Sequence, residues 1–513
     1  MNQKSVVVVG AGIGGLTAAA LLVKRGYRVT VYEQAGVTGG CASTFQRKDF
    51  TFDVGATQVA GLEVGGIHER IFTELGITVP AATYCDPSCA VLLPHESEPI
   101  NIWRSEGKWQ AERQRQFPNS EPFWQFMAEL FAPSWRFQGR DPVLPPRNLW
   151  DLWQLTKAVR LDTLGTMPYI LATVGDALRG FGLAGDRRLK TFLDLQLKLY
   201  SQADSEETAL LYAATALGLQ QEPLGLFHLK GSMQVLSDLL SDYIVANGGK
   251  ILLRHRVLAI EPKEGTAQVQ VQNLKASGKD SESQNPETWW HPADHVVANV
   301  TVNDWVRLLG KAAPTGYRRR VANLPHSSVA FVVYLGVDRA ALPANCPPHL
   351  QMLERYDDEP APRASLQKKP HSLFISVSQS GDGRAPDGKA TIIASEFTEP
   401  DLWWHESANY KQLKADFTER AIAQLQDYFD LEGKILYQEA ATPRTFARYT
   451  NRERGIVGGV GMRVNTFGPF GFANRTPLKN IWLVGDSTHP GEGTAGVSYS
   501  ALTTVRQIEA IDS

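Results

Sequence analysis

A glycine-rich loop near the start of the chain has the residue types and spacing that hold a dinucleotide. The hexapeptide Gly10–Gly15 (GAGIGG) follows directly after the β-branched segment Ser5–Val9. The stretch Leu16–Arg25 is rich in Ala and Leu, which predicts a helix, and Arg28–Tyr32 predicts a second strand that is closed by Glu33. Strand, glycine loop, helix, strand and acid in this order are typical of a βαβ dinucleotide site.

Each part of this motif has a physical reason. Gly10 permits a tight turn, Gly12 lets a pyrophosphate approach the backbone, and Gly15 lets the helix pack closely on the strand. The helix N-terminus presents free N–H groups and the positive end of its dipole to the phosphates. Glu33 can accept two hydrogen bonds from a ribose diol and would repel a 2′-phosphate, which favours FAD or NAD over NADP.

A second glycine turn favours FAD over NAD. Gly39-Gly40 follows Glu33 closely, and the segment Phe50–Gly55 (FTFDVG) comes soon after it. Backbone of this kind suits passage beside the rest of an extended dinucleotide, whereas a plain NAD domain would continue into further βα units.

The end of the chain carries a second candidate for the same site. Ile481–Val484 predicts a buried strand that ends in Gly485-Asp486, and a glycine-rich loop then opens a helix that begins at Val497. Asp486 is a candidate for binding the ribityl hydroxyls. The N–H groups of Gly496 and Val497 would face the flavin edge on which negative charge develops during reduction.

A catalytic acid or base is harder to find. His489, in the loop after Asp486, is a candidate for tuning the flavin or handling a proton, and bracing of the loop is the alternative. Neither a G-x-S-x-G elbow nor an H-E-x-x-H pair is present, so nothing indicates hydrolase chemistry. Cys85 and Cys89 lack a second pair of ligands nearby, so we expect no metal site.

The bulk composition limits the function classes. The chain has 513 residues, a formal net charge of −2 and 43% hydrophobic residues, which suits two or three domains with sizeable cores. It has no basic footprint for nucleic acid. Four cysteines in such a length suggest a reducing compartment. No signal peptide or transmembrane stretch is evident.

Other segments predict the elements that surround the cofactor. Strands are expected at Gly248–Ile260, His295–Val300, Val329–Gly336 and Ser372–Val377, an amphipathic helix at Leu413–Leu431, and exposed loops at Glu264–Glu287 and Asp357–Pro370. We expect an α/β fold with a sheet floor and a helical cap over the flavin.

Tryptophans gather outside the flavin segments, and the sequence leaves two interpretations of them open. Six of the twelve lie between Trp103 and Trp153, many at helical spacing. They fit core packing, or an apolar tunnel mouth that dips into one membrane leaflet. Lys157 and Arg160 nearby would meet anionic headgroups in the second case or form a solvated helix face in the first.

The chain resembles the phytoene desaturase and carotenoid isomerase branch of the FAD-dependent amine oxidase-like superfamily. The motifs that carry the resemblance are spread over nearly the whole length: VVVVGAGIGGLTAAALL, FTFDVGA, KGSMQVL, GGKILLRHRVLAI and NIWLVGDSTHPGEGTAGV. The stretches FDVGATQVAGLE, WRFQGRDPVLPPR, QLKLYSQ and ETALLYAATALG are similar to the subgroup of cyanobacterial carotenoid 3′,4′-desaturases, which act on the acyclic end of monocyclic carotenoids.

The resemblance implies a Rossmann-like FAD-binding domain of the glutathione reductase and amine oxidase type, assembled from separated segments. We expect residues 1–75, 226–300 and 455–513 in this domain, and residues 76–225 and 301–454 in an α+β substrate domain with a helical, membrane-contacting cap. The expected FAD contacts, including Val257 at the adenine, are Gly10, Ala11, Gly12, Gly14, Gly15, Glu33, Gly39, Gly40, Gly55, Ala56, Val257, Gly485, Asp486, Gly496 and Val497.

The implied activity is desaturation of a polyene. FAD would accept a hydride from an allylic carbon, and the protein would mainly position the substrate and exclude water. Quinone or oxygen would be the final electron acceptor, and the protein would be cytoplasmic and peripherally bound to a lipid surface. The alternatives are a carotenoid cis–trans isomerase that uses reduced FAD, a lipid-binding escort protein with the flavoprotein fold, and a soluble amine oxidase, whose usual C-terminal pattern differs.

Overall fold

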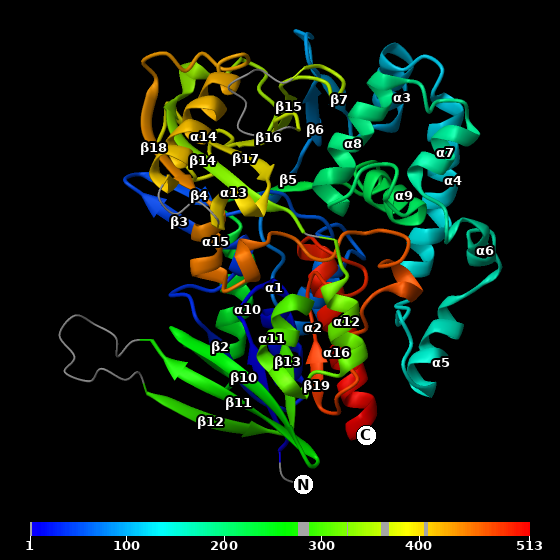
Figure 1. Cartoon of the computed structure of the whole chain (residues 1–513), viewed down its shortest axis with the longest axis vertical. Coiled ribbons are helices and arrows are strands. Elements are labelled where there is room, and N and C mark those ends of the chain that lie inside the picture. The colour runs from blue at the N-terminus through cyan, green and yellow to red at the C-terminus, as the bar shows by residue number, and fades with distance from the viewer. Residues whose placement is uncertain (1–2, 275–286, 326, 361–368, 405–408) are drawn as a thin grey trace.

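A three-layer α/β unit forms the lower half of the molecule (Figure 1). The computed structural model describes residues 3–274, 287–325, 327–360, 369–404 and 409–513. Its central sheet is parallel, with strand order β19–β13–β1–β2–β9. The strands are β1 (Ser5–Val9), β2 (Arg28–Glu33), β9 (Lys250–Leu253), β13 (His295–Ala298) and β19 (Ile481–Leu483). Strands β1 and β13, almost 300 residues apart in the sequence, therefore lie side by side.

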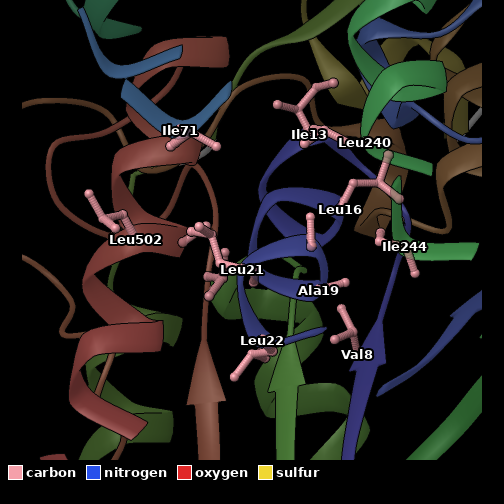
Figure 2. Close-up of a cluster of buried hydrophobic side chains, with 14 of the residues drawn as sticks. Val8, Ile13, Leu16, Ala19, Leu21, Leu22, Ile71, Leu240, Ile244 and Leu502 are labelled. Atoms are coloured by element: carbon pink, nitrogen blue, oxygen red, sulfur yellow. The ribbon is translucent and has the colours of Figure 1, made fainter. Parts of the chain in front are cut away.

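Four helices cover one face of this sheet. They are α1 (Ile13–Lys24), α2 (Ile67–Leu75), α10 (Gln234–Ala246) and α16 (Thr494–Asp512). Figure 2 shows α1 between α16 and α10, with Leu16 and Leu21 pointing into the shared core. Eleven of the twelve residues of α1 are buried, and its predicted start at Leu16 is three residues late. A helix so completely apolar is stable only in the middle of a layer.

The other face is covered by a small antiparallel sheet and a helix. The sheet has the order β10–β11–β12, and α11 (Val302–Leu309) packs beside it with Trp305 fully buried. Its strands are β10 (His255–Lys263), β11 (Thr266–Asn273) and β12 (Thr288–Ala293).

The single strand predicted over Gly248–Ile260 is wrong. Arg254 has a φ of +60° and breaks this segment into β9, in the parallel sheet, and β10, in the antiparallel one. The loop predicted over Glu264–Glu287 is likewise replaced in part by β11. Residues 275–286 of that loop, and 361–368 of the loop predicted over Asp357–Pro370, lie outside the described residues.

A seven-stranded sheet, with order β18–β14–β17–β16–β15–β6–β7, forms the floor of the upper half (Figure 1). On β14, Phe331 and Val333 point to one face, where α14 (Tyr410–Leu425) packs, and Val332 and Tyr334 point to the other. The helix predicted over Leu413–Leu431 thus starts and ends earlier. The strands are β6 (Cys89–Leu92), β7 (Ile100–Ile102), β14 (Val329–Asp338), β15 (His349–Leu353), β16 (Ser372–Val377), β17 (Lys389–Thr398) and β18 (Ile435–Ala441).

A helical region completes the upper half and extends along one side of the molecule (Figure 1). Its helices are α3 (Glu106–Gln116), α4 (Glu121–Gln138), α5 (Leu149–Ala158), α6 (Leu161–Leu164), α7 (Val174–Gly180), α8 (Arg187–Ser201) and α9 (Leu210–Gly218). Trp109 and Trp124 lie in its core, whereas Trp153 on α5 is 61% exposed. Core packing is therefore confirmed for Trp109 and Trp124, and the membrane-leaflet interpretation of the exposed Trp153 stays a prediction. Within the described ranges, no helix combines the length and apolarity that a membrane crossing requires.

Candidate functional site: a dinucleotide cleft that continues into an apolar cavity

A cavity of about 1360 Å³ lies between the parallel sheet, the seven-stranded floor and the helical region. The dinucleotide motifs line one part of it, and β14, β16 and β17 line another through residues such as Val332, Phe374 and Ile393. Helices α4, α8 and α9 supply further walls. The cavity is large enough to receive a dinucleotide and part of a second, apolar molecule.

The structure brings most of the predicted site residues to this one cavity. Ala11 and Gly15 do not line it. Those that do are Gly10, Gly12, Gly14, Glu33, Gly39, Gly40, Gly55, Ala56, Val257, Gly485, Asp486, His489, Gly496 and Val497.

The glycine loop is packed against an asparagine that the sequence analysis missed. A Cβ on Gly12 would lie 2.8 Å from Nδ2 of Asn299, and one on Gly14 would lie 2.9 Å from its Oδ1. A Cβ on Gly15 would lie 2.1 Å from the carbonyl oxygen of Gly10, so α1 starts in direct contact with the end of β1. Asn299 directly follows β13. Its position at the carboxyl end of a parallel strand, where ligands bind in such sheets, is the feature from which the sequence could have predicted it.

Glu33 organises the loop and keeps capacity for a ligand. Its Oε2 accepts the N–H of Ala11 at 2.7 Å, and its Oε1 accepts the N–H of Ala35 at 2.8 Å. Burial raises the pKa of this carboxyl, and the backbone donors oppose that rise. Each carboxylate oxygen has a second lone pair, so the hydroxyls of a ribose can still bind. Ala11 acts here through its N–H.

The part of the cleft predicted to hold the adenine carries two arginines beside Val257. Arg254 and Arg256 line the cavity with Val257, and Nε of Arg256 donates to Oε1 of Gln34 at 3.0 Å. The turn at Arg254, with its positive φ, leads the chain from β9 in the parallel sheet into β10 in the antiparallel one.

Asp486 is paired with an arginine from another segment. Nη2 of Arg452 lies 2.5 Å from Oδ2 of Asp486, and Nη1 of Arg452 donates to the carbonyl of Gly458 at 2.7 Å. The ion pair holds the carboxylate at the wall of the cavity, next to the turn at Gly485, which has a φ of +119°. Since Arg452 lies 34 residues before Asp486, nothing in the local pattern predicts the contact.

His489 braces the loop against the helical region. Its Nε2 lies 3.0 Å from Oε1 of Gln138 on α4, and its ring contacts Phe467 and Tyr499. Burial lowers the pKa of His489 to about 4, so the ring is neutral at pH 7. These contacts support the bracing role rather than proton transfer.

A second ionisable group in the same loop was missed. Glu492 lines the cavity, and Nε2 of Gln202 at the end of α8 donates to both of its carboxyl oxygens, at 3.4 and 3.3 Å. Burial and the nearby Asp486 raise the pKa of Glu492 to about 8. The sequence signal was an acidic residue inside a glycine-rich cofactor loop.

The fold and this cleft define a flavoprotein of the dinucleotide-binding class, and comparisons with known proteins agree. The model of the family "Flavin containing amine oxidoreductase" matches residues 13–509, so the chain belongs to that family.

Relatives and solved structures match over nearly the full chain. Prolycopene isomerase 2, chloroplastic, of an Oncidium hybrid cultivar is 24% identical over 99% of this chain and 84% of its own length. The 4,4′-diapophytoene desaturase (4,4′-diapolycopene-forming) of Methylomonas sp is 24% identical over 99% and 95%. The cyclohexylamine oxidase of Brevibacterium oxydans IH-35A has the same fold, with a TM-score of 0.61, 17% identity, and coverage of 99% and 100%.

The protein is therefore an FAD-dependent oxidoreductase. The residues present fit the cofactor for two reasons. The glycine loop has no room for a Cβ, so its backbone stays open to the pyrophosphate, and Glu33 at the end of β2 is a buried carboxylate with free lone pairs for a ribose. FAD supplies a two-electron hydride acceptor to the cavity. The chain itself supplies the cradle, the exclusion of water and the walls that orient a substrate.

Proposed function

We propose that this protein is a carotenoid desaturase that introduces the 3′,4′ double bond at the acyclic end of a monocyclic carotenoid. The hydride acceptor is FAD, and quinone or oxygen reoxidises it. The observation that carries the proposal is the continuity of the cofactor cleft with an apolar cavity that reaches an exposed apolar surface. The named activities of relatives support the substrate class. The bond position rests on the subgroup motifs in the sequence alone.

The apolar surface lies on the segment that walls the cavity. Leu149, Leu161 and Leu171 are 86%, 88% and 67% exposed. We call these three, with Leu152, Trp153, Leu164 and Met167, the apolar rim. From the same segment Leu155, Val159 and Ile170 line the cavity, so one short stretch separates its interior from the surroundings.

A bilayer leaflet is the environment that fits the rim. Burying each exposed leucine in hydrocarbon gains roughly 1.5–3 kcal/mol. Lys157 and Arg160 are exposed within the rim and suit anionic headgroups. A polyene dissolved in the leaflet would reach the cavity without crossing water. This supports a protein bound peripherally at a cytoplasmic membrane surface.

The activity is tested with purified protein, FAD, an electron acceptor and a monocyclic carotenoid in liposomes. Loss of two hydrogens by mass spectrometry, with a red-shifted visible spectrum, is the expected result. Unchanged mass with a new chromatographic peak would instead establish the second candidate, a cis–trans isomerase, which the prolycopene isomerases among the relatives favour. A colourless protein without bound flavin would contradict both.

The membrane surface is tested by liposome flotation. The double variant Leu149→Lys/Leu161→Lys is expected to lose most of its binding to vesicles. The matched control, Val245→Lys/Leu436→Lys, makes the same change at exposed apolar residues outside the rim (59% and 42% exposed) and should float like the wild type. Equal flotation of both variants would exclude the rim as the docking surface.

A further inference from the structure

The cavity holds a carboxyl group that the cofactor cradle does not use. Glu492 precedes Gly493, which caps α16, and its side chain lines the cavity beside Gln202. Space for it exists only because residue 458 is glycine: a Cβ there would lie 2.1 Å from Oε2 of Glu492 and 2.8 Å from Nε2 of Gln202. The carboxyl is thus held in a fixed place by a neutral amide.

Among the residues that the structure describes, no cation forms an ion pair with Glu492. Arg452, on the facing segment, is committed to Asp486 and to the carbonyl of Gly458. Asp486 lies on the same loop and Tyr212 on α9, and α8 presents Gln202, which does not titrate. Burial first, and then repulsion from Asp486, raise the pKa of the Glu492 carboxyl to about 8, against the smaller effects of Gln202, Gly459 and Arg452.

Aromatic and polar walls line the same cavity. Tyr212 donates its hydroxyl to the carbonyl of Tyr200, and its ring meets Phe467 edge to face at 5.6 Å between centroids. The hydroxyl of Tyr200 is buried and has no hydrogen-bond partner among the described residues. All three rings line the cavity, and ring faces stabilise a cation that develops close to them.

We propose that Glu492 is the catalytic acid–base residue of this protein and that Gln202 is its positioning residue. The proposal rests on the proposed desaturase function. The substrate loses a hydride from one carbon to FAD and a proton from the neighbouring carbon to the Glu492 carboxylate. The electron pair of the second C–H bond becomes the new π bond. FAD is reduced by two electrons, and Glu492 passes its proton to water.

A pH dependence follows. The carboxyl is the neutral acid at pH 7 and becomes the competent base as the pH rises through about 8. The rate of substrate oxidation should therefore fall about tenfold per pH unit below that point. Because Gln202 donates to the carboxyl and so favours its charged form, Gln202→Leu should move the midpoint to higher pH.

The protonation state is measured first, without turnover, by infrared difference spectroscopy of the holoenzyme. A carboxylic acid band that titrates near pH 8 should be present in the wild type and absent from Glu492→Gln. Glu419→Gln, at an exposed position on α14, is the matched control and should keep the band. A wild-type spectrum without that band at pH 6–7 would overturn the proposal.

Single-turnover oxidation of the carotenoid gives the second readout. Glu492→Gln should lose about 10²-fold or more of the rate and its pH dependence, while FAD content stays at the wild-type level. An unchanged rate and pH profile in Glu492→Gln would refute the role of Glu492 and leave the desaturase function standing. A wild-type protein that converts no carotenoid would refute the function, whatever the infrared titration shows.

Discussion

Replacing Gly15 by alanine tests the account of the cofactor cradle most directly. The new Cβ would lie 2.1 Å from the carbonyl oxygen of Gly10, and 3.1 Å from both Cβ and Nδ2 of Asn299. The first distance is about 1.3 Å short of the 3.4 Å at which ordinary contact begins. Because the obstructing atom is backbone at the end of a central strand, α1 has to move.

Overpacking of this kind costs about 1–3 kcal/mol. The movement of α1 carries Gly12, Gly14 and the helix N-terminus away from the position of the pyrophosphate, so the cost falls on FAD binding. At about 1.4 kcal/mol per tenfold, the Kd for FAD should rise roughly 5- to 150-fold.

The assay is fluorescence titration of the deflavinated protein with FAD. Gly316→Ala is the matched control, since a Cβ on this exposed glycine of α12 (Thr315–Ala322) meets open space. That variant should bind FAD normally and unfold at the same or a slightly higher temperature. A Gly15→Ala protein whose Kd stays within about twofold of the wild type would refute the reasoning.

Two further predictions concern buried charge and pH. Arg452→Met leaves Asp486 unpaired at 9% side-chain exposure, which should lower the free energy of unfolding by about 3–5 kcal/mol and release FAD on purification. The control Arg454→Met breaks a more exposed pair with Asp401 and should lower the free energy of unfolding by at most about 1 kcal/mol. Full flavin content and an unchanged melting temperature in Arg452→Met would contradict this. Burial lowers the pKa of His68 to about 4, below the value of 6.5 in the unfolded chain. Between these two values only the unfolded chain binds the proton. The contribution of His68 to stability is therefore complete above pH 6.5 and is lost as the pH falls toward 4. His68→Leu should flatten the loss of stability between pH 6.5 and 4, as measured by denaturant midpoints, and an unaltered slope would show that other groups cause it.

Local patterns predicted the βαβ unit because its signals are adjacent in the chain. The strands Ser5–Val9 and Ser372–Val377 were predicted at their observed bounds. Gly10, Glu33 and Gly39 were predicted from spacing alone, and all three line the cavity. The motif near residue 485 was recognised for the same reason, although α16 begins at Thr494, three residues earlier than predicted.

Contacts between distant segments could not be predicted from the sequence. Asn299 meets the glycine loop from β13, Arg452 reaches Asp486 from another segment, and Gln202 reaches Glu492 across 290 residues. Each partner is an ordinary polar residue whose role depends on tertiary placement. The break at Arg254 was missed because neither glycine nor proline marks it.

The order of strands in the parallel sheet has a consequence for synthesis on the ribosome. The neighbour of β1, β13, is made almost 300 residues after it, and the edge strand β19 almost 480 residues after it. Thr17 on α1 and Ser498 on α16 face each other at 3.3 Å, so the α1 layer is also incomplete until then. A nascent chain thus carries an unpaired, strongly apolar β1 edge until β13 has been made. The candidate cleft for FAD is complete only after residues 485–497 have been made, so we expect flavin loading to follow their synthesis.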